Sequence, residues 1–351
     1  MQAGKAYVPG EQRNTSDWIK INTNEFPFDP SPDVKEAIQK ACGKLRYYPD
    51  PTGSELREQI ASQYGVDPRQ VILFNGCDDA LNCCIRGLLD PGERAAFLNP
   101  SYSLYTTLLS NQAVMGVPLE YGPEFALPLQ SLIQCDAKML LLTSPNAPSG
   151  VAFKQEELLK LLHEKECIVV LDETYGDFAP WSAIPLIREF PNVIVVKSFS
   201  KTFGLAGLRL GFGIVHPDVV ETFHKIRDVY NVDRLAQAAG VAALKDKDYY
   251  REKHAIIAET RRSFSDFLQG QLGWSVLPSA TNFVFTIPVD PQQCSSPEIA
   301  QSLYAFLVEN RILVRYFSNH PLIASGLRIS IGTPEQMDRV QDQLQQWTKR
   351  A

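Results

Sequence analysis

The 351-residue sequence has no long apolar run and no concentrated stretch of positive charge. Its apolar runs, such as residues 139–142 and 167–171, are far shorter than the roughly 20 residues that a membrane helix needs. The first twenty residues lack the apolar segment typical of a signal peptide. Basic and acidic residues number 34 and 40, which gives a formal charge of −6. We therefore expect neither a membrane nor a nucleic-acid partner.

The sequence also lacks the histidine and cysteine spacings that indicate metal or disulfide sites. Its five histidines show no ligand spacing, so we predict no metal site. Its seven cysteines are an odd number, and none has a CxxC spacing. This pattern is typical of reduced, mostly buried thiols, so we expect a cytoplasmic protein. The length favours two domains, or one large layered unit with a smaller attachment.

Strand-like and helix-like segments alternate through the first two thirds of the sequence. The segment that follows residue 76 places Leu81, Cys84 and Leu88 on one helical face. The strand-like segments are continuous apolar runs at residues 71–74, 94–99, 138–143, 167–172 and 192–198. Continuous apolar strands separated by helices are typical of parallel strands buried on both faces. The predicted fold class is therefore α/β, with a mostly parallel central sheet.

The sequence changes character after about residue 235. A long helical span over residues 236–270 precedes shorter strand-like segments at residues 282–287, 312–317 and 326–332. These features predict a smaller α+β domain. The beginning of the chain is proline-rich and extended, which favours an arm rather than a core element. We predict an arm (residues 1–27), a large domain (residues 28–235) and a small C-terminal domain (residues 236–351).

Polar residues follow each of the five predicted strands of the large domain. The endings read "NGCDDA", "NPSYSLY", "SPNAPSG", "DETY" and "SFSK". Because ligands of open α/β sheets bind beyond the carboxyl ends of the strands, these groups should meet at one edge. One polar ending would carry little weight, but five of them predict an active site.

Four of these side chains suit an aromatic aldehyde that carries a basic ring nitrogen. Lys201 supplies an amine that can bind an aldehyde covalently. Asp172 follows an apolar strand, where a carboxylate is costly unless it meets a cation such as a protonated pyridine. Tyr102 offers a flat ring for stacking, and Tyr175 offers a phenol for a ring oxygen.

A second set of groups suits a phosphate. Ser198, Ser200 and Arg209 provide hydroxyls and a planar fork of donors. The turn before residue 77 opens a predicted helix, so the backbone N–H groups of Cys77 and Asp78 can join this site. Amine, carboxylate, aromatic ring and phosphate donors together are what pyridoxal 5′-phosphate (PLP) requires.

The chain resembles the fold-type I PLP-dependent aminotransferases and, within them, the histidinol-phosphate aminotransferase family. The resemblance covers nearly the whole sequence, and the most specific segment for the superfamily is "SFSKTFGLAGLRLGF" around Lys201. The segments "AYVPGEQ" and "YNVDRLAQAA" favour the histidinol-phosphate branch. The fold implied is that of the type I PLP transferases, with a large domain and a smaller α+β domain.

The resemblance implies a role for each matching residue. Lys201 would bind the cofactor and shuttle a proton, Asp172 would keep the ring nitrogen protonated, and Tyr175 would bond the ring hydroxyl. Tyr48 would reach the cofactor phosphate across a dimer interface, which implies a homodimer with shared active sites. The implied cofactor-binding residues are Gly76, Cys77, Asp78, Tyr102, Asn146, Asp172, Tyr175, Ser198, Ser200, Lys201, Arg209 and Tyr48.

Substrate contacts are implied in the same way. Arg328 matches the arginine that binds a substrate α-carboxylate, and Tyr7 and Arg315 match residues that contact the phosphate of histidinol phosphate. Asn24 matches a residue of the substrate pocket. The chain departs from the family at Ala147, where an asparagine beside the ring hydroxyl is usual, and Asn146 is the candidate replacement.

The expected activity is PLP-dependent transfer of an amino group between histidinol phosphate and 2-oxoglutarate, the reaction of histidine biosynthesis. The expected partners are a small-molecule amino donor and a 2-oxo acid. Two alternatives from the same branch remain open, an aromatic amino-acid aminotransferase and a threonine-phosphate decarboxylase. A regulatory or binding protein that keeps the fold without turnover is the alternative from another class.

Overall fold

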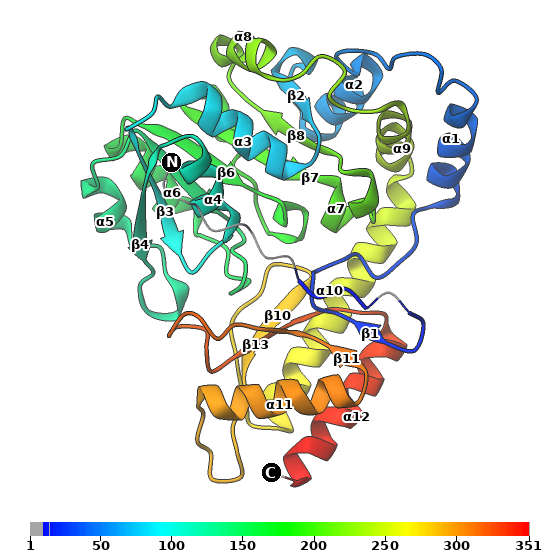
Figure 1. Ribbon diagram of the computed structural model, residues 1–351, viewed down its shortest axis with the longest axis vertical. Helices are drawn as coiled ribbons and strands as arrows, with labels where there is room; N and C mark the ends of the chain where they lie inside the picture. Colours follow the sequence, from blue (N-terminus) through cyan, green and yellow to red (C-terminus); the bar gives the residue numbers. More distant parts are fainter. Residues whose placement is uncertain (1–9, 14, 351) are drawn as a thin grey trace.

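The computed structural model describes residues 10–13 and 15–350 (Figure 1). Its largest sheet has the order β2-β8-β7-β6-β5-β3-β4. Within this sheet of the described chain, β8 runs antiparallel to both neighbours and the other neighbouring pairs are parallel. The strands are β2 (Val71–Phe74), β3 (Arg94–Asn99), β4 (Met115–Glu120), β5 (Met139–Thr143), β6 (Ile168–Asp172), β7 (Val193–Ser198) and β8 (Gly211–Ile214). The predicted α/β class with a mostly parallel central sheet is confirmed.

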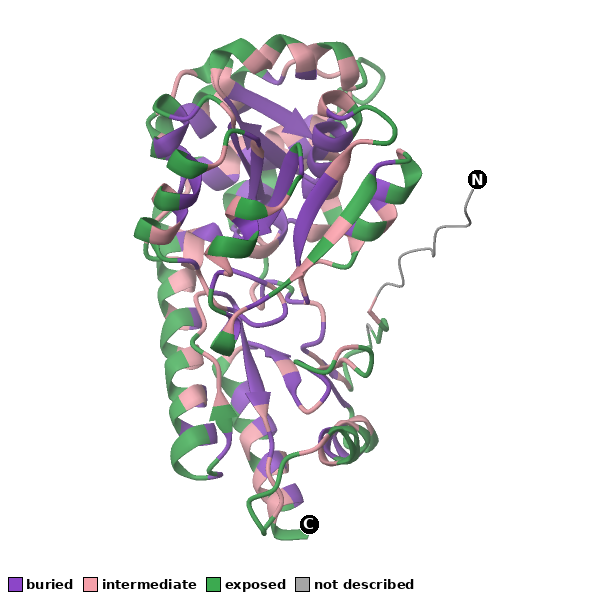
Figure 2. Ribbon diagram, turned by 90° about the vertical axis from the view of Figure 1, so that its left-hand side faces the viewer, coloured by how far each residue is buried: buried purple, intermediate pink, exposed green. Residues whose placement is uncertain are grey.

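The central sheet is buried because its strands are apolar at consecutive positions. Alternate residues of β5 divide between two cores, with Leu140 and Leu142 on one face and Met139 and Leu141 on the other. Helices cover both faces, and Figure 2 shows the buried strands enclosed by helices whose outer sides are exposed. Apolar runs that lack alternation therefore became strands inside a layered domain, as predicted.

The helices that surround this sheet begin and end where the sequence provides caps. Helix α3 starts after Gly76, and α9 starts after Asp233, whose side chain accepts from the N–H groups of Leu235 and Ala236. The helices are α1 (Pro32–Cys42), α2 (Ser54–Tyr64), α3 (Cys77–Leu88), α4 (Leu104–Asn111), α5 (Leu129–Gln134), α6 (Gln155–Glu164), α7 (Phe199–Thr202), α8 (Pro217–Ile226), α9 (Arg234–Lys245), α10 (Lys247–Gly270), α11 (Pro297–Glu309) and α12 (Pro334–Arg350). Short 3-10 turns occupy Pro68–Gln70, Pro123–Phe125, Gly176–Phe178, Ile184–Arg188 and Ala206–Leu208.

A second, four-stranded sheet has the order β12-β13-β10-β9 and is antiparallel. Its strands are β9 (Ser275–Val276), β10 (Phe283–Ile287), β12 (Arg315–Tyr316) and β13 (Leu327–Ser330). A separate parallel pair joins β1 (Ile19–Lys20) to β11 (Ile312–Leu313). This pairing brings part of the predicted arm into the protein core, where Ile19 and Ile21 are buried.

Two details of the predicted C-terminal half are wrong. The helical span over residues 236–270 is two helices, because the backbone of Asp246 (φ −86°, ψ 58°) leaves the helical region between α9 and α10. The single strand predicted over residues 312–317 is divided between β11 and β12, which belong to different sheets.

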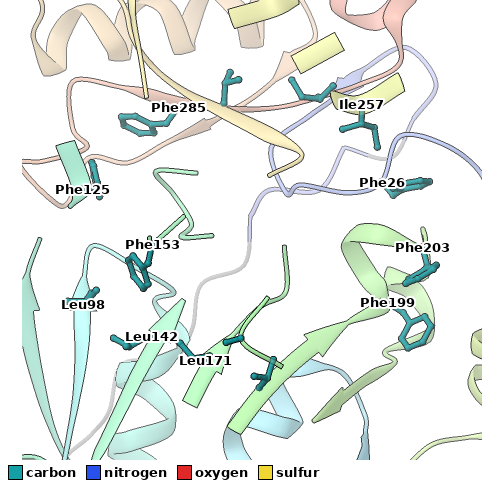
Figure 3. Packing of buried hydrophobic residues seen from close by; sticks show 14 of the residues in the cluster. Phe26, Leu98, Phe125, Leu142, Phe153, Leu171, Phe199, Phe203, Ile257 and Phe285 are labelled. Carbon is teal, nitrogen blue, oxygen red and sulfur yellow. The ribbon is translucent and has the colours of Figure 1, made fainter. Parts of the chain in front are cut away.

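The two sheets share one apolar core. Figure 3 shows Leu98, Leu142 and Leu171 from the central sheet and, across from them, Ile257 of α10 and Phe285 of β10. In Figure 1, α10 passes from the central sheet to the second sheet, beside α12. We propose that the two sheets mark the large and the small domain. None of the helices in the described residues is long and apolar enough to cross a membrane.

Candidate active site

A cavity of about 290 Å³ lies at the carboxyl edge of the central sheet. It is lined by strand endings of the large sheet, by residues 22–24 and by residues of the second sheet. Most of the predicted site residues line this cavity. They are Asn24, Cys77, Asp78, Tyr102, Asp172, Tyr175, Ser198, Ser200, Lys201, Arg209, Arg315 and Arg328.

Lys201 lies in α7, the short helix that follows β7. Its Nζ donates a hydrogen bond to the backbone oxygen of Thr23 at 2.8 Å. Burial, with a smaller contribution from the positive charge of Arg328, lowers the pKa of Lys201 to about 8. A substantial fraction of this amine is therefore neutral near physiological pH, and a neutral amine is a nucleophile.

Asp172 ends β6 and is only 3% exposed. Its Oδ1 accepts hydrogen bonds from the backbone N–H of Thr174 (3.0 Å) and from the thiol of Cys77 (3.6 Å). Burial raises the pKa of Asp172, although these hydrogen bonds oppose the shift. Within the described residues, no cationic side chain forms an ion pair with it. A buried carboxylate of this kind is complementary to a cation that enters the cavity.

Tyr175 is held from the second sheet through Asn24. The amide Nδ2 of Asn24 donates to the phenol oxygen of Tyr175 at 2.7 Å. The hydroxyl of Ser330 in β13 donates to Asn24 Oδ1 and accepts from the Asn24 N–H, both at 2.9 Å. The oxygen of Tyr175 therefore acts as an acceptor toward Asn24, which fixes the position of the phenol beside the cavity.

The start of α3 forms one wall of the cavity. Gly76 precedes it with φ 86°, and a Cβ at this position would lie 2.8 Å from Nη2 of Arg209. Glycine therefore allows both the turn and the close approach of the guanidinium. Arg209 itself has a left-handed backbone (φ 51°), which turns its side chain back toward α3.

Several donors converge beside this helix start. The Nη2 of Arg209 lies 3.1 Å from Asp78 Oδ2, and Nη1 lies 3.5 Å from Ser200 Oγ. Tyr102 donates to the other oxygen of Asp78 at 2.7 Å. Backbone N–H groups at a helix N-terminus, hydroxyls and a guanidinium together form an anion site.

Two arginines line the opposite part of the cavity. Arg315 in β12 and Arg328 in β13 are direct cross-strand partners, so they lie on the same face of the second sheet. The ring of Phe317 lies 5.6 Å from the guanidinium carbon of Arg315 and 5.5 Å from that of Arg328. The Nη2 of Arg328 also donates to the backbone oxygen of Asn22. The cavity therefore has a second anion-binding region, in addition to the start of α3.

Residues 16–344 match the family of class I and II aminotransferases. The histidinol-phosphate aminotransferase of Citrifermentans bemidjiense is 44% identical over 95% of this chain and 93% of its own length. That of a Synechocystis species is 42% identical over 95% of this chain and 93% of its length. The chain belongs to the histidinol-phosphate aminotransferase family.

Two solved structures have the same fold. The histidinol-phosphate aminotransferase of Sinorhizobium meliloti in complex with PLP has a TM-score of 0.84 and 28% identity, over 92% of this chain and 89% of that one. The L-threonine-O-3-phosphate decarboxylase of Porphyromonas gingivalis has a TM-score of 0.79 and 22% identity, over 94% and 99%. At that identity the second match establishes the fold alone.

Asn146 and Tyr48, two predicted residues of the family site, do not line the cavity. Asn146 is buried and its amide donates to Ser149 Oγ and Pro100 O, while Ala147 lines the cavity. The predicted ring contact of Asn146 stays a prediction that this geometry does not support. Tyr48 is 75% exposed and lies outside the cavity of its own chain. Tyr7 lies outside the described residues.

Some residues of this aminotransferase site were not predicted from the sequence. Thr23 contributes only a backbone oxygen, Ser330 acts through Asn24, and Phe317 lies between the two arginines. A backbone acceptor leaves no sequence signal. The position of Ser330 two residues after Arg328 was a usable signal, because alternate residues of a strand share one face.

Proposed function

We propose that this protein is a PLP-dependent aminotransferase that exchanges an amino group between histidinol phosphate and 2-oxoglutarate, in histidine biosynthesis. The observation that carries the proposal is the 44% identity to a histidinol-phosphate aminotransferase over 95% of the chain. The cavity supports it, because an amine, a buried carboxylate and two anion sites face the same space.

The residues present fit PLP. Asp172, a buried carboxylate without a cationic partner among the described residues, suits the protonated ring nitrogen. The start of α3 with Ser198, Ser200 and Arg209 suits the phosphate. Lys201 supplies the amine that binds the aldehyde. When bound, PLP supplies an electrophilic carbon and a ring that withdraws electrons from the substrate.

The protein's own groups then hold charge and move protons. The Asp172 carboxylate would stabilise the positive charge of the protonated ring nitrogen in this buried site. Lys201, with its pKa lowered to about 8, can accept a proton from the substrate carbon and return it to a neighbouring carbon. Tyr175, oriented by Asn24, donates to the ring oxygen. These roles use the same side chains that the structure brings to one cavity.

Arg315 and Arg328 supply the substrate end of the proposed site. Histidinol phosphate has a phosphate but no α-carboxylate, whereas glutamate has two carboxylates. Two adjacent guanidinium groups can bind either a phosphate or a carboxylate, because each guanidinium presents a planar fork of donors. We propose that one cationic region serves both half-reactions, with Arg315 the more important for the phosphate.

We also propose a homodimer with shared active sites. Exposed large apolar side chains include Leu45, Tyr47, Tyr48, Val229 and Tyr230. The rings of Tyr48 and Tyr230 stack at 4.5 Å, so two of these exposed side chains, far apart in the sequence, lie side by side. Apolar surface of this kind favours an interface. Seven free thiols among the described residues support a reducing, cytoplasmic location.

A panel of amino donors tests the proposed function. The purified protein is mixed with histidinol phosphate, phenylalanine, tyrosine, glutamate or O-phosphothreonine, and the absorbance of bound PLP is followed in single half-reactions. We expect the fastest change with histidinol phosphate and a productive change with glutamate. Preference for phenylalanine would indicate an aromatic aminotransferase, and release of CO₂ from O-phosphothreonine a decarboxylase. Cofactor binding without any turnover would indicate a binding protein.

A further inference from the structure

One buried lysine of the central sheet takes no part in the proposed chemistry. Its side chain lies on the face opposite the cavity. Lys197 is in β7, four residues before Lys201, and is 1% exposed. Its Nζ lies 2.9 Å from Asp177 Oδ1 and 3.5 Å from Glu173 Oε2. It also lies 5.1 Å from the centre of the Tyr64 ring. A buried cation between two carboxylates is a costly arrangement, so its position calls for an explanation.

Strand register places this cluster on the face opposite the cavity. Asp172 of β6 pairs with Val196 of β7, and the N–H of Glu173 donates to the Val196 oxygen. The next residues along the two strands, Glu173 and Lys197, therefore share a face. Asp172 and Ser198 line the cavity instead. Successive residues of a strand point to opposite sides, so the two sets lie back to back.

The carboxylates are fixed from both sides. Glu173 accepts from the Ser182 hydroxyl and from the Ala183 N–H, both at 2.6 Å. Asp177 accepts from the Tyr64 hydroxyl at 3.0 Å. Burial lowers the pKa of Lys197, but the two carboxylates outweigh this and the net shift is upward. Burial likewise raises the pKa of Asp177, and Lys197 more than offsets it. These shifts favour the charged forms of Lys197 and Asp177.

The cluster brackets the segment that carries two active-site residues. Glu173 directly follows Asp172, and Asp177 comes two residues after Tyr175. Between them, Gly176 has no side chain where a Cβ would lie 2.8 Å from both Lys197 Nζ and Glu173 Cβ. The close approach of the lysine thus depends on this glycine. Lys197 consequently attaches both ends of the 173–177 segment to β7.

We propose that Lys197, through Glu173 and Asp177, is a positioning residue that holds Asp172 and Tyr175 in place for the cofactor ring. The inference rests on the proposed use of PLP. Neither carboxylate is assigned a contact with the cofactor, and the lysine acts through the backbone of residues 173–177. A fixed segment matters because a binding residue that is loosely held loses affinity and alignment.

The test compares variants by PLP binding and by the pH titration of the bound cofactor's absorbance. Lys197→Met removes the charge and keeps the length. In metal centres, loss of an outer partner costs about 10- to 100-fold in affinity, and we expect a loss of that order for PLP. We also expect the pH midpoint of the absorbance change to rise, because a displaced Tyr175 no longer draws negative charge from the ring oxygen.

Two further variants keep the test decisive. Gly176→Ala retains every charge but pushes a Cβ into the cluster, so it should shift PLP affinity and pH midpoint in the same direction even if Lys197→Met folds poorly. Lys197→Arg retains the positive charge, and we expect values near those of the wild type. If Lys197→Arg bound PLP as weakly as Lys197→Met, the effect would depend on side-chain shape and not on charge. That result would overturn the proposed role of the ion pairs of Lys197.

Leu344→Ala is the control for general destabilisation, because Leu344 is fully buried in α12 and does not line the cavity. It should lower the melting temperature and leave PLP affinity and the pH midpoint unchanged. Lys197→Met and Gly176→Ala proteins that behave like this control would overturn the inference. A wild-type protein that bound no PLP would instead overturn the proposed function, and the inference with it.

Discussion

Lys201 and Asp172 are ionisable groups of opposite charge, and burial favours the neutral form of each. The pKa of Lys201 is lowered to about 8 and that of Asp172 is raised, in both cases mainly by burial. Burial therefore works against the charged form of each side chain in the cavity. Each shift suits its proposed partner, because the aldehyde needs a neutral amine and the ring nitrogen, once protonated, restores a charged carboxylate.

The lowered pKa of Lys201 predicts how PLP capture depends on pH. The amine is neutral above its pKa, so the rate of covalent capture should rise between pH 6 and 8 and level off above about pH 8. Stopped-flow absorbance at limiting PLP measures this rate, and borohydride followed by peptide mapping should locate the label on Lys201. A Lys201→Ala control should bind PLP only noncovalently and should not transaminate. A rate that still climbs steeply near pH 10 would contradict the shift.

Asp172→Asn should separate catalysis from stability. Loss of the carboxylate should slow transamination by at least about a hundredfold, or roughly 2.7 kcal/mol of transition-state stabilisation. The cofactor-free variant should nevertheless melt at a higher temperature than the wild type at pH 7, because a buried carboxylate with a raised pKa destabilises the folded state when ionised. The difference in melting temperature should shrink toward about pH 4, where the wild-type carboxyl is protonated. Scanning calorimetry across this range is the measurement.

The two arginines of the second sheet should differ in their kinetic effects. Arg315→Ala should raise KM for histidinol phosphate well over tenfold, since loss of one partner of a buried charge pair typically costs about 2–5 kcal/mol. It should affect glutamate much less, whereas Arg328→Ala should impair both half-reactions. Single-turnover kinetics with each donor distinguishes these patterns. Equal impairment of histidinol phosphate and phenylalanine by Arg315→Ala would favour the aromatic aminotransferase.

At the scale of elements, the strand endings made the site predictable. Each of the five predicted strands has an apolar run, and each is followed by a polar segment that the parallel topology brings to one edge. Strands β4 and β8 were not predicted. The first is a largely exposed edge strand that contains Pro118, and the second contains Gly211 and Gly213 and reads as part of the loop after Lys201. Neither has the apolar run that identified the others.

Contacts that cross between elements were the part of the site beyond prediction. The bond from Ser330 to Asn24 joins positions 306 residues apart, and the bond from Lys201 to Thr23 uses a carbonyl that every residue has. The contact of Asn146 with the cofactor ring stays a prediction, since its side-chain amide donates to Ser149 Oγ and Pro100 O. Residue type identified the chemistry, whereas side-chain direction depended on packing.

Ser330→Ala tests the connection between the two sheets. The change removes the acceptor of the buried Asn24 N–H and the donor to its side chain. An unsatisfied buried group costs about 1–3 kcal/mol, so the melting temperature should fall, and transamination should slow as Tyr175 loses its support. Ser265→Ala is the matched control, because that hydroxyl bonds a carbonyl within its own helix. Equal effects of the two changes on turnover would contradict a connection to Tyr175.

At the scale of the whole molecule, the exposed Tyr48 predicts complementation between defective chains. Tyr48→Ala and Lys201→Ala should each be nearly inactive. In a mixed dimer, one site would combine the intact Lys201 of one protomer with the intact Tyr48 of its partner. Mixing the two variants by reversible unfolding should therefore restore about one quarter of wild-type activity, since half of the dimers are mixed and half of their sites are complete. No recovery, or an active monomer in sedimentation, would refute shared sites.

The cross-strand pair of Arg315 and Arg328 has a consequence for how the small domain is assembled. Strand β12 is two residues long, and one of its two partners in β13 carries the same charge as the residue it faces. Like charges directly opposite each other oppose strand pairing. A phosphate or carboxylate bound by both guanidinium groups would offset this repulsion. We therefore expect a bound substrate to stabilise the pairing of β12 with β13, so substrate recognition would also support the edge of this sheet.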